Sequence, residues 1–133
     1  MSKLKILVYS DDSSIRQNLI SALGKRLAPE LPENEILEFA TGPAIRQYLD
    51  SKGKADLFIL DGEAAPEGGM GIARQLKDEI FNCPPVLLIV ARAEDHWLGS
   101  WSRAEDVVVY PIDPFTFASR AAKLITARTL AKN

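Results

Sequence analysis

The sequence predicts a single α/β domain in which a five-stranded parallel sheet is covered by five helices on its two faces, a doubly wound three-layer sandwich. Short apolar runs alternate with segments of helical periodicity along the whole chain. Two of the runs, 56–61 between its terminal aspartates and 86–91, are apolar throughout, as in strands that are buried on both faces. Polar residues directly follow several runs, at the edge of the sheet where such folds bind ligands.

Each element in the first half of the chain has a local signal. The first helix should begin behind a cap at Asp12 or Ser13 and end near Ala28, because Pro29 cannot continue it. Apolar residues recur between these points at helical spacing. The second helix opens at 41–43 with a proline in its first turn. The predicted elements are a strand at 4–9, a helix from 13 to about 28, a strand at 35–39, a helix at 42–49 and a strand at 56–61.

The same alternation continues through the second half. Residues 62–71 contain too many glycines for a confident helix and are predicted to form a long, mobile loop. The last helix should start at Pro114 behind an Asp113 cap. The predicted elements are a helix with Ile72, Ala73, Leu76 and Ile80 on one face, a strand at 86–91, a short helix from 94 to about 102, a strand at 107–109 and a helix from 114.

Length and composition exclude several classes of protein. A chain of 133 residues with 47% hydrophobic content predicts one domain, 1–133, with its own core. The net charge of −2 gives no basic surface for nucleic acid, and the longest apolar run is too short to cross a membrane. Residues 1–5 do not resemble a signal peptide, so we expect a cytoplasmic protein. Single Cys83 and His96 residues argue against a disulfide and against a Cys- or His-rich metal site.

The residues at the strand ends are the first functional candidates. Asp61 ends the third predicted strand and Asp11 follows the first. Val90 and Tyr110 close the fourth and fifth strands. Because parallel strands end at one edge of the sheet, these four residues should lie near one another. Asp61, which is carried to this edge by a buried strand, is the strongest candidate.

Four segments in register resemble the response-regulator receiver (CheY-like) domain of bacterial two-component signalling. They cover almost the whole chain, in the family's order and at nearly its separations. The resemblance implies a flavodoxin-like fold and, in active members, a cycle in which a histidine kinase passes a phosphoryl group to an aspartate. The four segments are residues 5–12, 56–61, 85–95 and 104–111.

The resemblance assigns roles to the acidic residues by position. Asp61 matches the phosphoacceptor, and Asp11, Asp61 and the backbone carbonyl of Glu63 match the ligands of a Mg²⁺ ion. A hard cation on oxygen anions offsets the charge of an incoming phosphate. The family usually has adjacent acids at the positions of Ser10 and Asp11, and here the first is a serine. Asp12 either joins the ligands or caps the following helix.

Three switch positions depart from the family pattern. Val90 replaces a threonine or serine, Tyr110 replaces a lysine, and Val107 replaces the switch aromatic. A rival register that matches 113–115 to the family's Lys-Pro-Phe also loses the lysine, and it is disfavoured because Asp113 and Pro114 already open the last helix. Family analogy suggests a cis peptide after Tyr110. A phosphoryl group on Asp61 should therefore lack two partners, each worth roughly 1.5–3 kcal/mol.

A tryptophan pair suggests an interaction surface. Trp97 and Trp101 stand four residues apart and should share one face of a short helix. Either they pack against neighbouring strands or they form an exposed patch of the kind that anchors protein interfaces, which Phe115 could extend. In receivers the fourth helix, fifth strand and last helix form the usual output surface, so a homodimer through this face is one expectation.

These observations favour an atypical, stand-alone receiver that acts mainly by binding another protein, with weak or absent phosphorylation and no enzymatic activity beyond self-phosphorylation at Asp61. The alternative is a residually active, Mg²⁺-dependent phosphoacceptor in a phosphorelay, with a histidine kinase as partner. A weaker alternative is a module that binds a flavin or another small molecule. Residues 68–71 lack the lysine of a P-loop and give that alternative little support.

Overall fold

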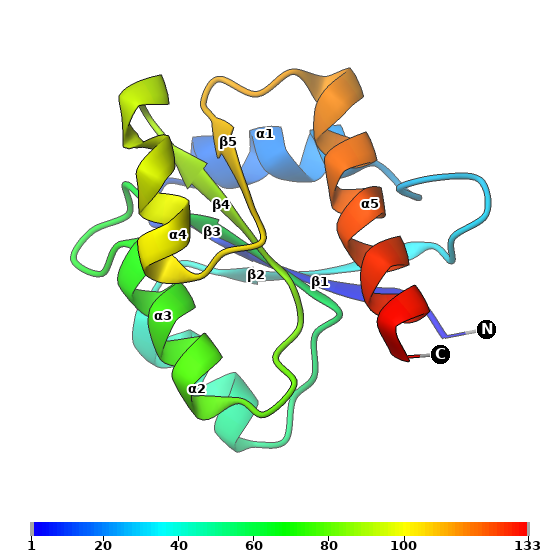
Figure 1. Cartoon of the computed structure of the whole chain (residues 1–133), viewed down its shortest axis with the longest axis horizontal. Coiled ribbons are helices and arrows are strands. Elements are labelled where there is room, and N and C mark those ends of the chain that lie inside the picture. Colours follow the sequence, from blue (N-terminus) through cyan, green and yellow to red (C-terminus); the bar gives the residue numbers. More distant parts are fainter. Residues whose placement is uncertain (1, 133) are drawn as a thin grey trace.

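The computed structural model describes residues 2–132 as one parallel sheet with the strand order β2-β1-β3-β4-β5 and helices on both faces (Figure 1). This is the predicted doubly wound architecture. None of its helices is long and apolar enough to span a membrane. The elements are β1 (Leu4–Tyr9), α1 (Ser13–Leu23), β2 (Asn34–Phe39), α2 (Gly42–Asp50), β3 (Leu57–Asp61), α3 (Gly69–Glu79), β4 (Val86–Val90), the 3-10 helix η1 (Ala93–Trp97), α4 (Leu98–Ser102), β5 (Asp106–Val109) and α5 (Pro114–Lys132).

Apolar side chains fill both faces of the sheet. Leu57 and Ile59 of β3 join the core under α1 and α5, whereas Phe58 and Leu60 join the core under α2 and α3. Helices α3 and α4 lie beside each other on one side of the molecule, away from α5 (Figure 1). All five residues of β3 are buried, which explains why its sequence does not alternate with polar residues. This central strand fixes the position of Asp61.

The predicted helix starts are confirmed where a cap was assigned. The Asp12 carboxylate accepts hydrogen bonds from the backbone N–H groups of Ser14 and Ile15 at the start of α1, at 2.8 and 3.4 Å. Asp113 accepts the N–H of Phe115 at 3.0 Å, and Pro114 is the first residue of α5. These caps satisfy N–H groups that have no partner within the helix.

The prediction that the first helix continues to about Ala28 is wrong. Helix α1 ends at Leu23, because Gly24 follows with φ +67°, a conformation that glycine adopts without strain and that stops the helix. Leu27 is nevertheless 7% exposed and belongs to the core, which explains the misleading periodicity. The chain there folds back and pairs Arg26 with Glu33 in an antiparallel bridge.

The prediction of a loop through residue 71 is also wrong, because α3 begins at Gly69. A Cβ at Gly69 would lie 2.7 Å from the backbone oxygen of Asp61, so the missing side chain lets the helix approach the end of β3. The predicted helix from 94 to 102 divides into η1 and α4. Gly99 brings α4 against the sheet, where its Cβ would lie 2.4 Å from Val107 Cγ2.

The close approach at Gly69 yields a prediction with an internal control. Gly69→Ala should lower the free energy of unfolding by about 1–3 kcal/mol, because the new methyl group meets backbone atoms that cannot move aside. Gly71→Ala, two residues later in the same helix with no atom within 4 Å of the new Cβ, should raise it by up to about 1 kcal/mol. Urea unfolding measures both. Equal effects of the two substitutions would contradict the packing described here.

Candidate functional site

The carboxyl ends of the strands bring the predicted site residues together. Tyr110 directly follows β5, and its backbone N–H donates to the carbonyl of Val90, the last residue of β4, at 2.8 Å. On the other side of β3, the hydroxyl of Ser10 lies 2.8 Å from the carboxylate of Asp61. Asp11 comes next in the chain and is exposed. The predicted gathering at one edge of the sheet is therefore present.

The Asp61 carboxylate is almost fully buried and holds a hydrogen-bond donor on each oxygen. Asp61 is only 2% exposed. Oδ2 accepts from the Ser10 hydroxyl at 2.8 Å, and Oδ1 accepts from the backbone N–H of Glu63 at 2.8 Å. Ser10 is fully buried and itself accepts the N–H of Asp12 at 3.1 Å. Two neutral donors thus satisfy a buried carboxylate that would otherwise be costly to bury.

Magnesium binding by Asp11, Asp61 and the backbone carbonyl of Glu63 stays a prediction of the receiver resemblance. Ser10 stands where the family has an acid, and its hydroxyl donates to Asp61 rather than offering a charged oxygen to a cation. Asp12 takes the capping role, one of its two predicted alternatives. Within residues 2–132 no three His, Cys, Asp or Glu side chains lie close enough together to hold a metal ion, and the predicted set has only two such side chains beside the Glu63 carbonyl. Asp11 is the acid beside Asp61 that remains for Mg²⁺, which prefers anionic oxygen ligands.

Two of the three switch positions, Val90 and Val107, lie among apolar side chains, and the third, Tyr110, contacts a neighbouring helix. Val90 is fully buried and Val107 is 5% exposed, and both belong to the core under α2 and α3. Tyr110 packs against the opposite core, and its hydroxyl accepts a hydrogen bond from the amide of Asn18 on α1. The Tyr110–Pro111 peptide is cis, as family analogy suggested.

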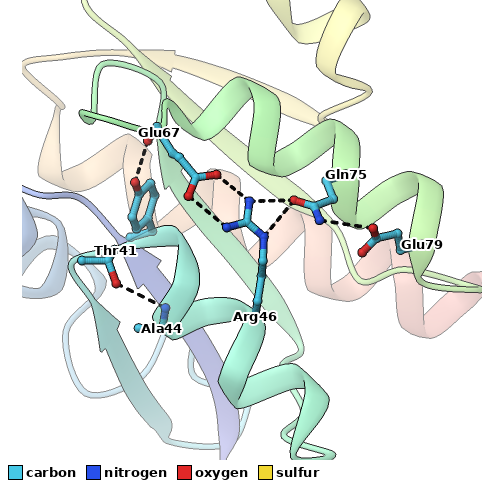
Figure 2. Close-up of polar contacts among 7 residues, drawn as sticks. Thr41, Ala44, Arg46, Glu67, Gln75 and Glu79 are labelled. Atoms are coloured by element: carbon cyan, nitrogen blue, oxygen red, sulfur yellow. Dashed lines mark hydrogen bonds and ion pairs between the residues drawn. The ribbon is translucent and has the colours of Figure 1, made fainter.

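The loop between β3 and α3 is fixed by contacts that the sequence did not reveal (Figure 2). Arg46 of α2 donates to both carboxylate oxygens of Glu67, at 2.9 and 2.5 Å, and also to the Gln75 side chain of α3. The buried Tyr9 hydroxyl donates to the Glu67 carbonyl at 2.5 Å. The hydrogen bond from Arg46 lowers the pKa of Glu67. The predicted mobile loop is thus tied to β1, α2 and α3.

The tryptophan pair is exposed, which decides between the two predicted alternatives. Trp97 is 64% exposed and Trp101 is 47% exposed, and both line a groove beside α3. Phe115 is 90% exposed but lines a separate groove between α5 and residues 27–30. Phe115 therefore lies outside the tryptophan groove, and its part in a wider interaction surface stays a prediction.

Two similar proteins show the family to which this chain belongs. Two response regulatory proteins of Mycobacterium tuberculosis, from strains CDC 1551 and H37Rv, are each 52% identical to this chain over 124 residues, which is 93% of the chain and 92% of the relative. The chain belongs to the response-regulator receiver family. It is therefore a receiver domain of two-component signalling, as the resemblance predicted. No family model matches the sequence.

Solved receiver structures share the fold. The receiver domain of the Francisella response regulator 1452 superposes with a TM-score of 0.78 at 18% identity, covering 94% of this chain and 98% of its own. A BeF3-activated receiver domain of DrrB from Thermotoga maritima gives 0.71 at 21% identity, covering 94% and 99%. These likenesses confirm the CheY-like, flavodoxin-like α/β fold. Receiver domains generally bind Mg²⁺ at the phosphorylation site and interact with histidine kinases and other proteins.

The hydrogen bond between Ser10 and Asp61 should make a measurable contribution to the stability of this receiver. Ser10→Ala removes one donor from a buried carboxylate and should lower the free energy of unfolding by about 1–3 kcal/mol. A double-mutant cycle with Asp61→Ala, followed by urea unfolding, should give a coupling energy of about 1.5–3 kcal/mol between the two side chains. Additive effects would show that this bond does not hold the carboxylate.

Proposed function

We propose that this receiver is atypical: it acts mainly by binding another protein, and phosphorylation at Asp61 is weak or absent. The observation that carries the proposal is that each oxygen of the Asp61 carboxylate already accepts a hydrogen bond from a neutral donor of the protein. The Ser10 hydroxyl and the Glu63 amide engage its two oxygens, in a receiver whose family places a cation beside this residue. The carboxylate has its partners before any phosphoryl group arrives.

The energetics of a phosphoryl adduct support the proposal. A phosphoryl group carries close to two negative charges, and its site needs donors or cations to hold it. Val90 offers no hydroxyl, and the Tyr110 phenol offers no positive charge and is bonded to Asn18. Each missing charge-assisted hydrogen bond removes roughly 1.5–3 kcal/mol from the stability of the adduct.

The binding half of the proposal is supported by the exposed tryptophans. Large aromatic side chains supply much of the binding energy in many protein interfaces. Trp97 and Trp101 are both exposed and line one groove. We propose no enzymatic activity beyond self-phosphorylation.

A residually active phosphoacceptor is the second candidate function. It is favoured by one observation, the retention of Asp61 at the end of β3 with the exposed Asp11 beside its strand. In that case a histidine kinase would be the partner, and Mg²⁺ would reach the site through Asp11. The experiment below separates the two functions.

Intact-mass spectrometry after incubation with acetyl phosphate and Mg²⁺ tests the proposal directly. We expect the parent protein to gain little or no phosphoryl mass at any time, including samples quenched within seconds to capture a short-lived adduct. An adduct on most of the parent protein that is absent from Asp61→Asn would contradict the proposal and establish the phosphoacceptor function.

A restored variant provides the positive control for that experiment. Ser10→Asp, Val90→Thr and Tyr110→Lys together return an acid, a hydroxyl and an ammonium group to the positions where the family has them. This triple variant should become labelled at Asp61, and adding Asp61→Asn to it should abolish the label. Circular dichroism of all variants verifies that the fold is retained.

A further inference from the structure

We propose that the groove between α3 and the η1–α4 segment is the docking site for a basic amphipathic helix of a partner protein. The apolar side of that helix would lie on Trp97 and Trp101, and its lysine or arginine side chains would reach the acidic carboxyl edge of the sheet. The inference rests on the proposed function, because it names the surface and the partner chemistry of a receiver that acts by protein binding.

The shape and lining of the groove suit one face of a helix. The cavity has a volume of about 580 Å³ and lies between two helices that pack beside each other. Its apolar walls come from Met70 and Ile72 of α3 and from Trp97, Leu98 and Trp101 on the other side. A groove between packed helices, with large apolar side chains spaced along it, is a recurrent way of binding an amphipathic helix.

Contacts within the protein hold the Trp101 anchor in place before any partner binds. The guanidinium of Arg74 lies over the Trp101 ring, 5.0 Å from its centre, and donates to the Trp101 carbonyl at 2.9 Å. The close contact of Gly99 with Val107 seats α4 against the sheet. A rigid aromatic anchor loses little conformational entropy on binding, so its buried area contributes more to affinity.

The edge of the sheet beside the groove carries excess negative charge. Its arginines already face carboxylates: Arg46 pairs with Glu67, and Arg92 pairs with Asp95 at 3.0 Å. Glu94 lies 4.0 Å from the same Arg92. In the part of the chain that the structure describes, no ion pair engages Asp11, Asp61 or Glu63. The excess acid therefore has no cation of its own.

The pKa shifts of nearby groups agree with an excess of negative charge at this edge. The pKa of Tyr9 is raised by burial first, and then by the charges of Glu67, Asp11 and Asp61. The pKa of Arg92 is raised by its hydrogen bond to Asp95 first and also by the charge of Glu63. These groups flank both ends of the loop that runs from Glu63 to the groove.

The absence of the family's lysine indicates that a partner should supply a positive charge. In the family a lysine lies at the position of Tyr110, and this chain has replaced its charge with a phenol that bonds to α1. A lysine or arginine from a partner would offset the charge of Glu63, which no ion pair engages among the described residues, and would share Glu94 with Arg92. The negative charge of this edge repels nucleic acid and anionic lipid. A basic protein segment matches both the apolar walls of the groove and the negative charge of the edge.

A pair of synthetic peptides tests the proposal on the full chain. Both peptides are amphipathic helices of about five turns with the same leucine and tryptophan face, and they differ only in having lysine or glutamate on the polar face. With a fluorophore on each peptide, anisotropy measures binding. We expect the lysine peptide to bind at least about tenfold more tightly than the glutamate peptide, with a difference that shrinks as salt is added.

Matched variants locate the site. Trp97→Ala/Trp101→Ala should weaken the lysine peptide by about tenfold or more, and Glu63→Gln/Glu94→Gln should remove most of the preference for lysine over glutamate. Phe115→Ala, which removes an exposed aromatic ring from the other groove, should leave binding unchanged. Failure of the lysine peptide to bind, equal binding of both peptides, or a Phe115→Ala effect as large as that of the tryptophan change would overturn the inference.

The same assay separates this inference from the proposed function. In one outcome, peptide binding responds to Trp97→Ala/Trp101→Ala and also changes after acetyl phosphate treatment of the parent protein, but not after treatment of Asp61→Asn. That outcome would keep the docking site and overturn phosphorylation-independent action. No response to the tryptophan change, together with no phosphoryl adduct, would overturn the docking site and keep the proposed function.

Discussion

The burial of one carboxylate determines most of what this receiver can do. Asp61 ends a strand that is covered on both faces, so its charge cannot rely on water and must be stabilised by fixed donors. The Ser10 hydroxyl and the Glu63 amide supply them. Each oxygen of the carboxylate already accepts one hydrogen bond. These bonds, together with the loss of the family's lysine and hydroxyl, support our proposal that phosphorylation is weak or absent.

The loop that follows Asp61 and the tryptophan groove that it borders are held by contacts within the protein. Arg46 and Tyr9 hold Glu67 from two sides, so the segment that leaves Asp61 is tied to α2 and to β1. The same segment borders the groove that holds Trp97 and Trp101. In our account the molecule presents one preformed binding surface, and the arrival of a partner replaces phosphorylation as the event that matters.

Local signals in the sequence were sufficient for the strands, the caps at Asp12 and Asp113 and the family, because each depends on residues close together in the chain or on motifs in fixed order. They failed where the cause was a distant contact. The start of α3 depends on Gly69 meeting the end of β3, and the fixed loop depends on Arg46, 21 residues away from Glu67. The placement of the tryptophan groove away from α5 required knowing which face of the sheet each helix covers.

The most direct test of this account is the amide NMR spectrum of the protein before and after addition of beryllofluoride and Mg²⁺, which together mimic a phosphoryl group on a carboxylate. We predict that the amide signals of Gly62, Glu63 and Val90 do not shift, because Asp61 keeps its bonds to Ser10 and Glu63. Saturable shifts of these amides that are lost in Asp61→Asn would contradict the account and show that the acid site still accepts a phosphoryl group.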